Sequence, residues 1–196
     1  EHVMEVGTYH KELSGSQKKK ESMFGVLKAI KNLRNYGNGY VNFGEPMNIN
    51  TFLNEQVPNW KDAIDPIDPQ KPNWLTPSVN KLADNVMTAV NKSTAINGVS
   101  LTALILHASE NKALSKVDLI SQLDFFLSMQ RQAPYSELLT LPEESGAQLV
   151  EHVISLNKVT INQDSFGEII SLSDSAILEM RYYRNNILHT FVLPAP

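Results

Sequence analysis

The fold is decided by the stretch SGAQLVEHVISLNKVTINQDSFGEIISLSDS, residues 145–175. Apolar residues at helical spacing predict a helix over 145–156. Val159 and Ile161 then alternate with polar residues, a turn follows at Asp164 to Gly167, and the run Ile169 to Leu172 comes after it, which predicts a β-hairpin. Ser173 is a good N-cap for a last helix. A helix, a hairpin and a further helix in this order indicate a domain that mixes helices with a small sheet.

Upstream of this stretch the pattern is helical. Thr76-Pro77 predicts a helix start, since proline is favoured at the first helical position. A short and very apolar helix is expected over 100–108. Ser115 with Asp118 resembles a capping box and predicts a helix to about Arg131. Three helices followed by a hairpin over 100–172 give a winged-helix-like order.

Winged helices often bind DNA, but the charge of this part argues against it. Residues 99–172 hold four Lys and Arg against nine Asp and Glu. DNA binding depends on neutralising phosphates, and an acidic surface is repelled by them. We therefore expect no nucleic-acid partner and interpret residues 78–196 as a helical packing or protein-contact module.

The first part of the chain predicts a different architecture. Residues 22–34 have one apolar helical stripe, and Tyr40 to Phe43 suggest a short strand. A basic loop, a helix and a strand in this order suggest the end of an α/β domain, here residues 1–56. Five prolines then mark residues 57–77 as a crossing segment, since proline fixes φ and removes a hydrogen-bond donor. We expect Trp60 and Trp74 to pin this segment to the body of the protein.

Composition excludes several classes of site. The chain has 196 residues, 42% of them hydrophobic and 19% charged, with a net charge of −4 and no cysteine. The missing cysteine excludes a disulfide scaffold and a thiol nucleophile. No glycine-rich phosphate loop occurs, no two histidines have helical metal-ligand spacing, and no apolar run is long enough to span a membrane. No cofactor and no metal are expected, and a start at Glu1 suggests a piece of a longer protein.

Positive charge is concentrated near the beginning. Residues 11–34 hold seven Lys and Arg against two Glu, whereas the whole chain is acidic. Such asymmetry suggests an anionic partner, namely phosphate, anionic lipid or an acidic protein, for that stretch. The alternative is a solvated loop and helix face.

Five motifs resemble one family along essentially the whole chain. They are EHVMEVGTY (1–9), KELSG (11–15), KKKES (18–22), YVNFGEP (40–46) and YYRNNILH (182–189). In this order they closely resemble the C-terminal portion of the bacterial membrane-bound sn-glycerol-3-phosphate 1-acyltransferases. The resemblance therefore implies an α+β, predominantly helical chain: a remnant of the α/β acyltransferase domain followed by the helical module with its hairpin.

The resemblance also implies an activity. The family transfers a fatty acyl group from acyl-CoA or acyl carrier protein to sn-glycerol 3-phosphate, giving lysophosphatidic acid. It works as a peripheral enzyme at the cytoplasmic face of the bacterial inner membrane. Its general base is a His followed five positions later by an Asp. No histidine of this chain has an Asp at that distance, so we expect the chain alone to be inactive and to hold no catalytic residue.

Two roles for the chain follow from the resemblance. In the first, Lys18, Lys19, Lys20 and Ser22, with Glu1, bind the substrate phosphate or lipid headgroups; the alternative is a solvated loop with Ser22 as a helix cap. In the second, the helical module is a non-catalytic scaffold that contacts the catalytic domain, the membrane or a partner protein. Tyr182, Tyr183, Arg184 and His189 would then face the partner, the alternative being ordinary helix packing.

Overall fold

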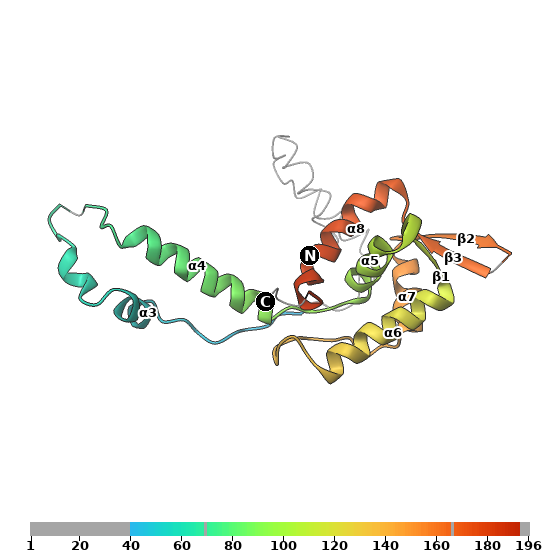
Figure 1. The fold of residues 1–196 in the computed structure, drawn as a ribbon, viewed down its shortest axis with the longest axis horizontal. Helices are drawn as coiled ribbons and strands as arrows, with labels where there is room; N and C mark the ends of the chain where they lie inside the picture. Colours follow the sequence, from blue (N-terminus) through green and yellow to red (C-terminus); the bar gives the residue numbers. More distant parts are fainter. Residues whose placement is uncertain (1–39, 69, 166, 193–196) are drawn as a thin grey trace, which may run out of the picture.

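The computed structural model describes residues 40–68, 70–165 and 167–192. These residues form a helical bundle with a small sheet, and a long arm that extends from it (Figure 1). The arm, residues 40–92, contains α3 (Ile49–Gln56), the 3-10 helix η1 (Trp60–Ala63) and α4 (Leu75–Lys92). The bundle, residues 93–192, contains every other element.

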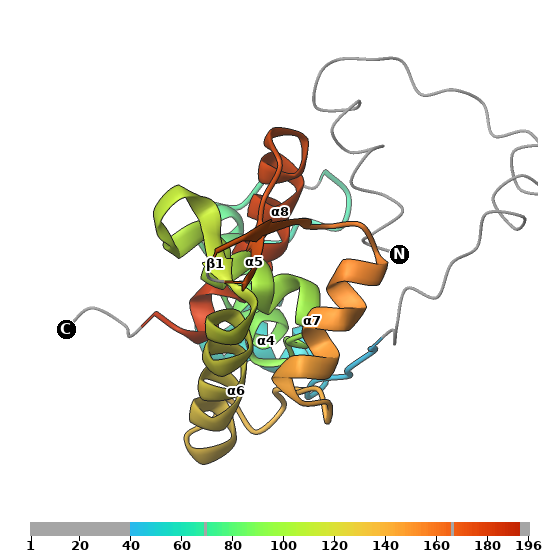
Figure 2. The same cartoon turned by 90° about the vertical axis from the view of Figure 1, so that its right-hand side faces the viewer.

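The bundle is built around α5 (Gly98–Ala108). Every residue from Gly98 to Leu106 is buried, because three further helices pack on it. These are α6 (Lys116–Gln132), α7 (Gly146–Ser155) and α8 (Asp174–Ile187), with the 3-10 helices η2 (Glu110–Lys112) and η3 (Leu188–Thr190) at helix ends. Figure 2, which looks onto the bundle, shows α5 surrounded by α6, α7 and α8.

The sheet is antiparallel and three-stranded, in the order β1-β3-β2. The predicted hairpin is confirmed as β2 (Thr160–Asp164) and β3 (Gly167–Ser171), and Gly167 takes φ +118 at the turn. The strand β1 (Ala113–Ser115) was not predicted, because three residues have no pattern of their own and pairing with β3 defines it. The protein is thus mostly helical with a small sheet, as expected of the α+β class.

The predicted helix starts in the bundle are confirmed to within a residue or two. Ser115, Ser145 and Ser173 are the N-caps of α6, α7 and α8, and each side chain accepts a hydrogen bond from the backbone N–H three residues on. The apolar helix α5 begins at Gly98 rather than residue 100, because Asn97 and Ser100 form its capping box.

Two expectations for the arm were wrong. Tyr40 to Phe43 form no strand, since no other strand of the described residues lies beside them; instead the Asn42 side chain donates to the Ser93 carbonyl at 2.9 Å. Trp60 and Trp74 do not pin the crossing segment to the bundle. Their rings pack edge to face on each other, 6.1 Å apart, and close the far end of the arm.

Candidate functional site

The arm has no hydrophobic core of its own. All nineteen buried hydrophobic residues of the described chain lie at Ile96 or later, and the one buried residue of α3 and α4 is Ser78. Eleven of the twenty-one exposed large hydrophobic side chains, by contrast, lie in the arm. They are Tyr40, Val41, Phe43, Met47, Ile49, Ile64, Ile67, Val79, Val86, Met87 and Val90. Exposed apolar patches mark interaction sites, which makes the arm the candidate interaction surface.

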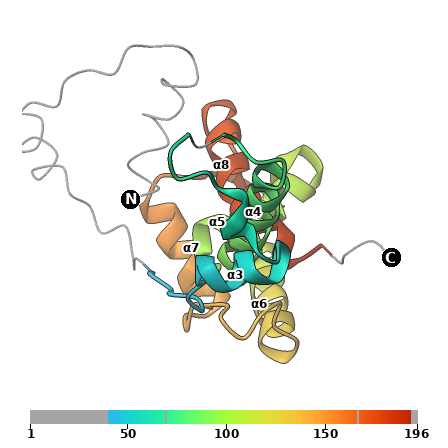
Figure 3. The ribbon, with the colours of Figure 1, turned by 90° about the vertical axis from the view of Figure 1, so that its left-hand side faces the viewer.

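The apolar surface of α4 is ordered like a helix-docking seam. Val79, Ala83, Val86 and Val90 follow one another at spacings of four, three and four residues, so they lie on one side of the helix. Val79, Val86 and Val90 are 52%, 39% and 57% exposed. α3 lies beside α4 (Figures 1 and 3), and Leu82 and Ala89 of α4 are half-buried. The seam itself is uncovered among the described residues.

The base of the arm is fixed to the bundle by polar contacts. Thr140 exchanges backbone hydrogen bonds with Thr94 and Ile96, at 3.0 and 2.9 Å. The His189 Nε2 atom lies 3.2 Å from the Thr94 hydroxyl and 3.1 Å from the Asn91 carbonyl. Asn42, besides its bond to Ser93, donates to the Thr140 hydroxyl at 3.1 Å. These hydrogen bonds join the first residues of the arm and the end of α4 to the bundle.

The residues expected to face a partner separate into two groups. Tyr183 is 3% exposed, and its hydroxyl donates to Glu179, while burial raises the pKa of its phenol. His189 holds the arm base and packs edge to face on Tyr135. Tyr182, 37% exposed, and the half-buried Arg184 remain accessible. Their contact with a partner stays a prediction.

The other predicted site residues lie outside the described residues. Glu1, Lys18, Lys19, Lys20 and Ser22, and the basic stretch 11–34, precede residue 40.

Metal and membrane-spanning features were searched in the same described ranges. No three His, Asp or Glu side chains there are grouped so that they could hold a metal ion. No described helix has the length and hydropathy to cross a bilayer.

Fold and site together define a helical module from which an arm with an exposed apolar helix extends. The sequence pattern described as "Glycerol-3-phosphate acyltransferase C-terminal region" matches residues 9–196, and the chain belongs to this family. It is 78% identical to a glycerol-3-phosphate acyltransferase of Colwellia psychrerythraea and 54% and 50% identical to those of Pseudoalteromonas translucida and Shewanella halifaxensis. Each match covers all of this chain but only 24% of the relative. No solved structure matches the chain.

Proposed function

We propose that this chain is the non-catalytic C-terminal region of a glycerol-3-phosphate 1-O-acyltransferase. The whole enzyme would transfer a fatty acyl group from acyl-CoA or acyl carrier protein to sn-glycerol 3-phosphate, as a peripheral protein at the cytoplasmic face of the inner membrane. The carrying observation is the 78% identity over the whole chain to a relative about four times as long. No histidine in the chain has an Asp five positions later, which supports placing the chemistry elsewhere.

Within that enzyme we propose three parts for the chain. Residues 1–56 are the C-terminal part of the α/β acyltransferase domain. Residues 57–77 are the proline-rich segment that connects it to the helical module, residues 78–196. The basic loop with Lys18 to Lys20 approaches phosphate groups, whereas the module braces the catalytic domain.

The seam on α4 is the surface that docks the catalytic domain. The spacings of four, three and four residues from Val79 through Ala83 and Val86 to Val90 suit a facing helix. A membrane-surface helix usually carries several Lys and Arg on its polar face and large aromatic side chains on the other. α4 has Lys81 and Lys92 against Asp84 and no aromatic residue, so a protein partner fits better.

An acyl-transfer assay tests the placement of the chemistry. The 196-residue chain and a chain extended upstream through the His-Asp motif would each be given palmitoyl-CoA and glycerol 3-phosphate. We expect lysophosphatidic acid from the longer chain alone. Product from the shorter chain, or none from a folded longer chain in lipid, would contradict the proposal.

A pair of matched variants tests the seam. In the extended chain, V86D adds one charge to the seam, and T88D adds one charge to the opposite side of the same helix, two residues further on. We expect the first variant to lose activity and protease resistance and the second to keep both, because burying an unpaired carboxylate is costly. Equal behaviour of the two variants would show that the seam is not a contact surface.

A further inference from the structure

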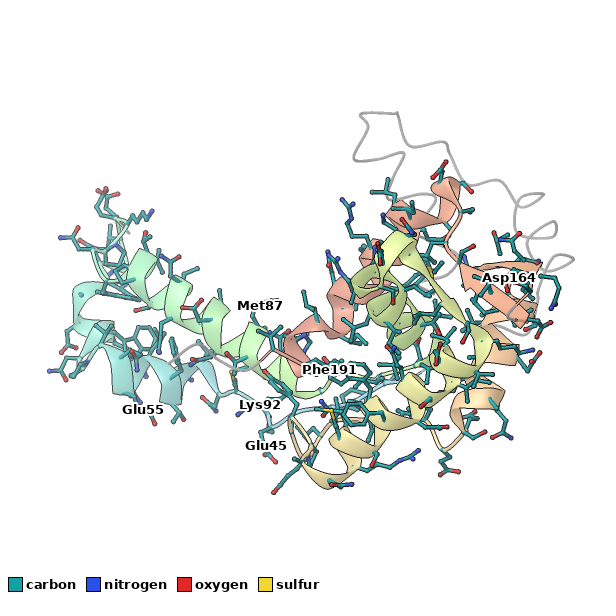
Figure 4. All side chains as sticks on the ribbon, turned by 45° about the vertical axis from the view of Figure 1, so that its right-hand side comes forward. Glu45, Glu55, Met87, Lys92, Asp164 and Phe191 are labelled. Atoms are coloured by element: carbon teal, nitrogen blue, oxygen red, sulfur yellow. The ribbon has the colours of Figure 1, made fainter. Side chains whose placement is uncertain are left out.

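The seam on α4 is left uncovered by the described residues. Val79, Val86 and Val90 are 52%, 39% and 57% exposed, although α3 lies beside the same helix (Figure 3). Met87, labelled on α4 in Figure 4, borders the seam and is 56% exposed. Apolar side chains exposed in a row along a helix cost free energy in water, so we expect another segment to cover them.

A separate molecule is a poor occupant for so small a surface. Specific interfaces between separate proteins bury about 1,200–2,000 Å². The seam consists of three valines and one alanine on a helix of 18 residues, which is about 27 Å long. A segment tethered to the arm needs less contact area, because a short linker gives it an effective concentration in the millimolar range.

One segment of this chain has the matching pattern. Residues 22–34, which lie outside the described residues, carry the apolar stripe that predicts a helix. Spacings of three, four and three residues separate its members Met23, Val26, Ile30 and Leu33. The seam has the same alternation of threes and fours, and two helices with this alternation interdigitate.

The start of the described chain keeps this segment close to the seam. Asn42 donates to the carbonyl of Ser93, the C-cap of α4, at 2.9 Å. Position 42 comes eight residues after position 34, and eight residues span at most about 28 Å. A helix that ends at Arg34 therefore reaches the seam easily when it runs parallel to α4. The antiparallel direction would need an almost fully extended linker.

Net charge favours the same arrangement. Residues 22–34 hold three Lys and Arg and no Asp or Glu, whereas residues 40–92 hold four Lys and Arg against six Asp and Glu. The segment and the arm therefore attract each other.

Side-chain size also fits the parallel direction. In the register with Leu33 opposite Val86, position 30 lies opposite Ala83. The bulky Ile30 then fills the space beside the smallest residue of the seam, which is the alternation of large and small that packs well.

We propose that residues 22–34 of this chain form a helix that covers the seam on α4. The inference rests on the proposed function, in which the seam docks the catalytic domain, and it names the segment of that domain that makes the contact. This contact gives α4 the hydrophobic partner that the described residues lack.

Thiol labelling tests the contact in the 196-residue chain, which contains no cysteine. V86C places a single thiol in the seam, and T88C places one on the opposite side of α4. Each labelling rate with iodoacetamide is divided by the rate of the same variant in urea. We expect the thiol of V86C to react about tenfold or more slowly than that of T88C, since covering the seam with a free energy of about 1.4 kcal/mol leaves a tenth of it open.

A matched pair of substitutions identifies the segment. I30D adds a carboxylate to the apolar stripe, and N32D adds one to the opposite side of the predicted helix. We expect I30D to raise the labelling rate of V86C to that of T88C and N32D to leave it unchanged, because an unpaired carboxylate is costly to bury. Unfolding of the bundle in urea, which neither substitution should shift, is the control.

Each outcome decides the inference. Slow labelling of V86C that I30D abolishes, and that is the same in dilute and concentrated samples, supports it. Equal labelling of V86C and T88C, or equal effects of I30D and N32D, would overturn it. Slow labelling in concentrated samples alone would also overturn it, because a second copy would then be the occupant.

The comparison of V86D with T88D in the extended chain remains an independent test of the proposed function. Loss of activity in that V86D variant, without slow labelling of V86C in the 196-residue chain, would assign the seam to another part of the catalytic domain. The present inference would then be wrong and the docking role of the seam would stand.

Discussion

Gly146 lies where the first turn of α7 meets α6, at a distance that leaves no room for a side chain. A Cβ atom there would lie 2.6 Å from the Ile120 carbonyl oxygen, and the Gly146 N–H donates to the Asp124 carboxylate at 2.6 Å. We expect Gly146→Ala to lower the free energy of unfolding by about 1–3 kcal/mol, since overpacking forces the backbone to shift. Urea titration followed by circular dichroism measures this.

Gly44→Ala is the matched control for that substitution. Its Cβ would meet only the Ser93 hydroxyl, at 3.8 Å, which is ordinary contact. We expect a change within about 0.5 kcal/mol, as for most surface substitutions. Similar losses in the two variants would contradict the packing argument.

His107 makes the stability of the bundle depend on pH. Desolvation and the nearby cations lower the pKa of its imidazole below the ordinary 6.5. The unfolded chain therefore binds this proton more readily than the folded chain, and stability falls as the pH drops from about 6.5 through the lowered pKa of the folded state. We expect H107Q to flatten this part of the profile, measured by urea titration at a series of pH values. An unchanged slope below pH 6.5 would mean that other groups cause the loss.

At the scale of elements, we expect the loss of an N-cap to lower global stability more in α5 than in α3. Asn97 caps α5, which is buried along most of its length, and Asn48 caps α3, which has no buried residue. We expect Asn97→Ala to lower global stability by about 1–2 kcal/mol, because the cap is lost from the helix that the others pack on. We expect Asn48→Ala to make local opening of α3 more frequent. It should change the global free energy of unfolding by no more than about 0.5 kcal/mol.

Denaturant unfolding and amide hydrogen exchange together separate these two effects. Global unfolding reports on Asn97, and exchange of the α3 amides reports on Asn48. If Asn48→Ala lowered global stability as much as Asn97→Ala, the arm would have to unfold together with the bundle.

Helix starts and the hairpin could be predicted because their causes are local. Ser115 and Ser173 are cap residues beside apolar periodic runs, and the turn signal between residues 164 and 167 joins β2 to β3. β1 and the irregular segment at Tyr40 to Phe43 could not be predicted in this way. A stretch this short forms a strand only where another strand lies beside it. β3 lies beside β1, but no strand of the described residues lies beside Tyr40 to Phe43.

At the scale of the whole molecule, the contacts between distant segments could not be predicted. The charge asymmetry of the first 34 residues is visible in the sequence, but the packing of α8 on α5, more than 60 positions earlier in the chain, is not. The exposure of the α4 seam could not be predicted either. Valines at helical spacing predict an apolar helix face, but they do not show whether another element of the chain packs on it.

We expect the bundle to fold without most of the arm, because all the buried hydrophobic residues of the described chain lie in the bundle. Residues 91–196 retain all nineteen buried hydrophobic residues and the Asn91 carbonyl that lies 3.1 Å from His189 Nε2. They lose eleven exposed large hydrophobic side chains of residues 40–90. We therefore expect this shortened chain to unfold cooperatively at a midpoint close to that of the 196-residue chain, to bind less of a hydrophobic dye, and to elute as a smaller and more uniform species on size exclusion. A chain of residues 91–196 that failed to fold would contradict this prediction, because it would show that the bundle needs the arm for its stability although no buried hydrophobic residue lies there.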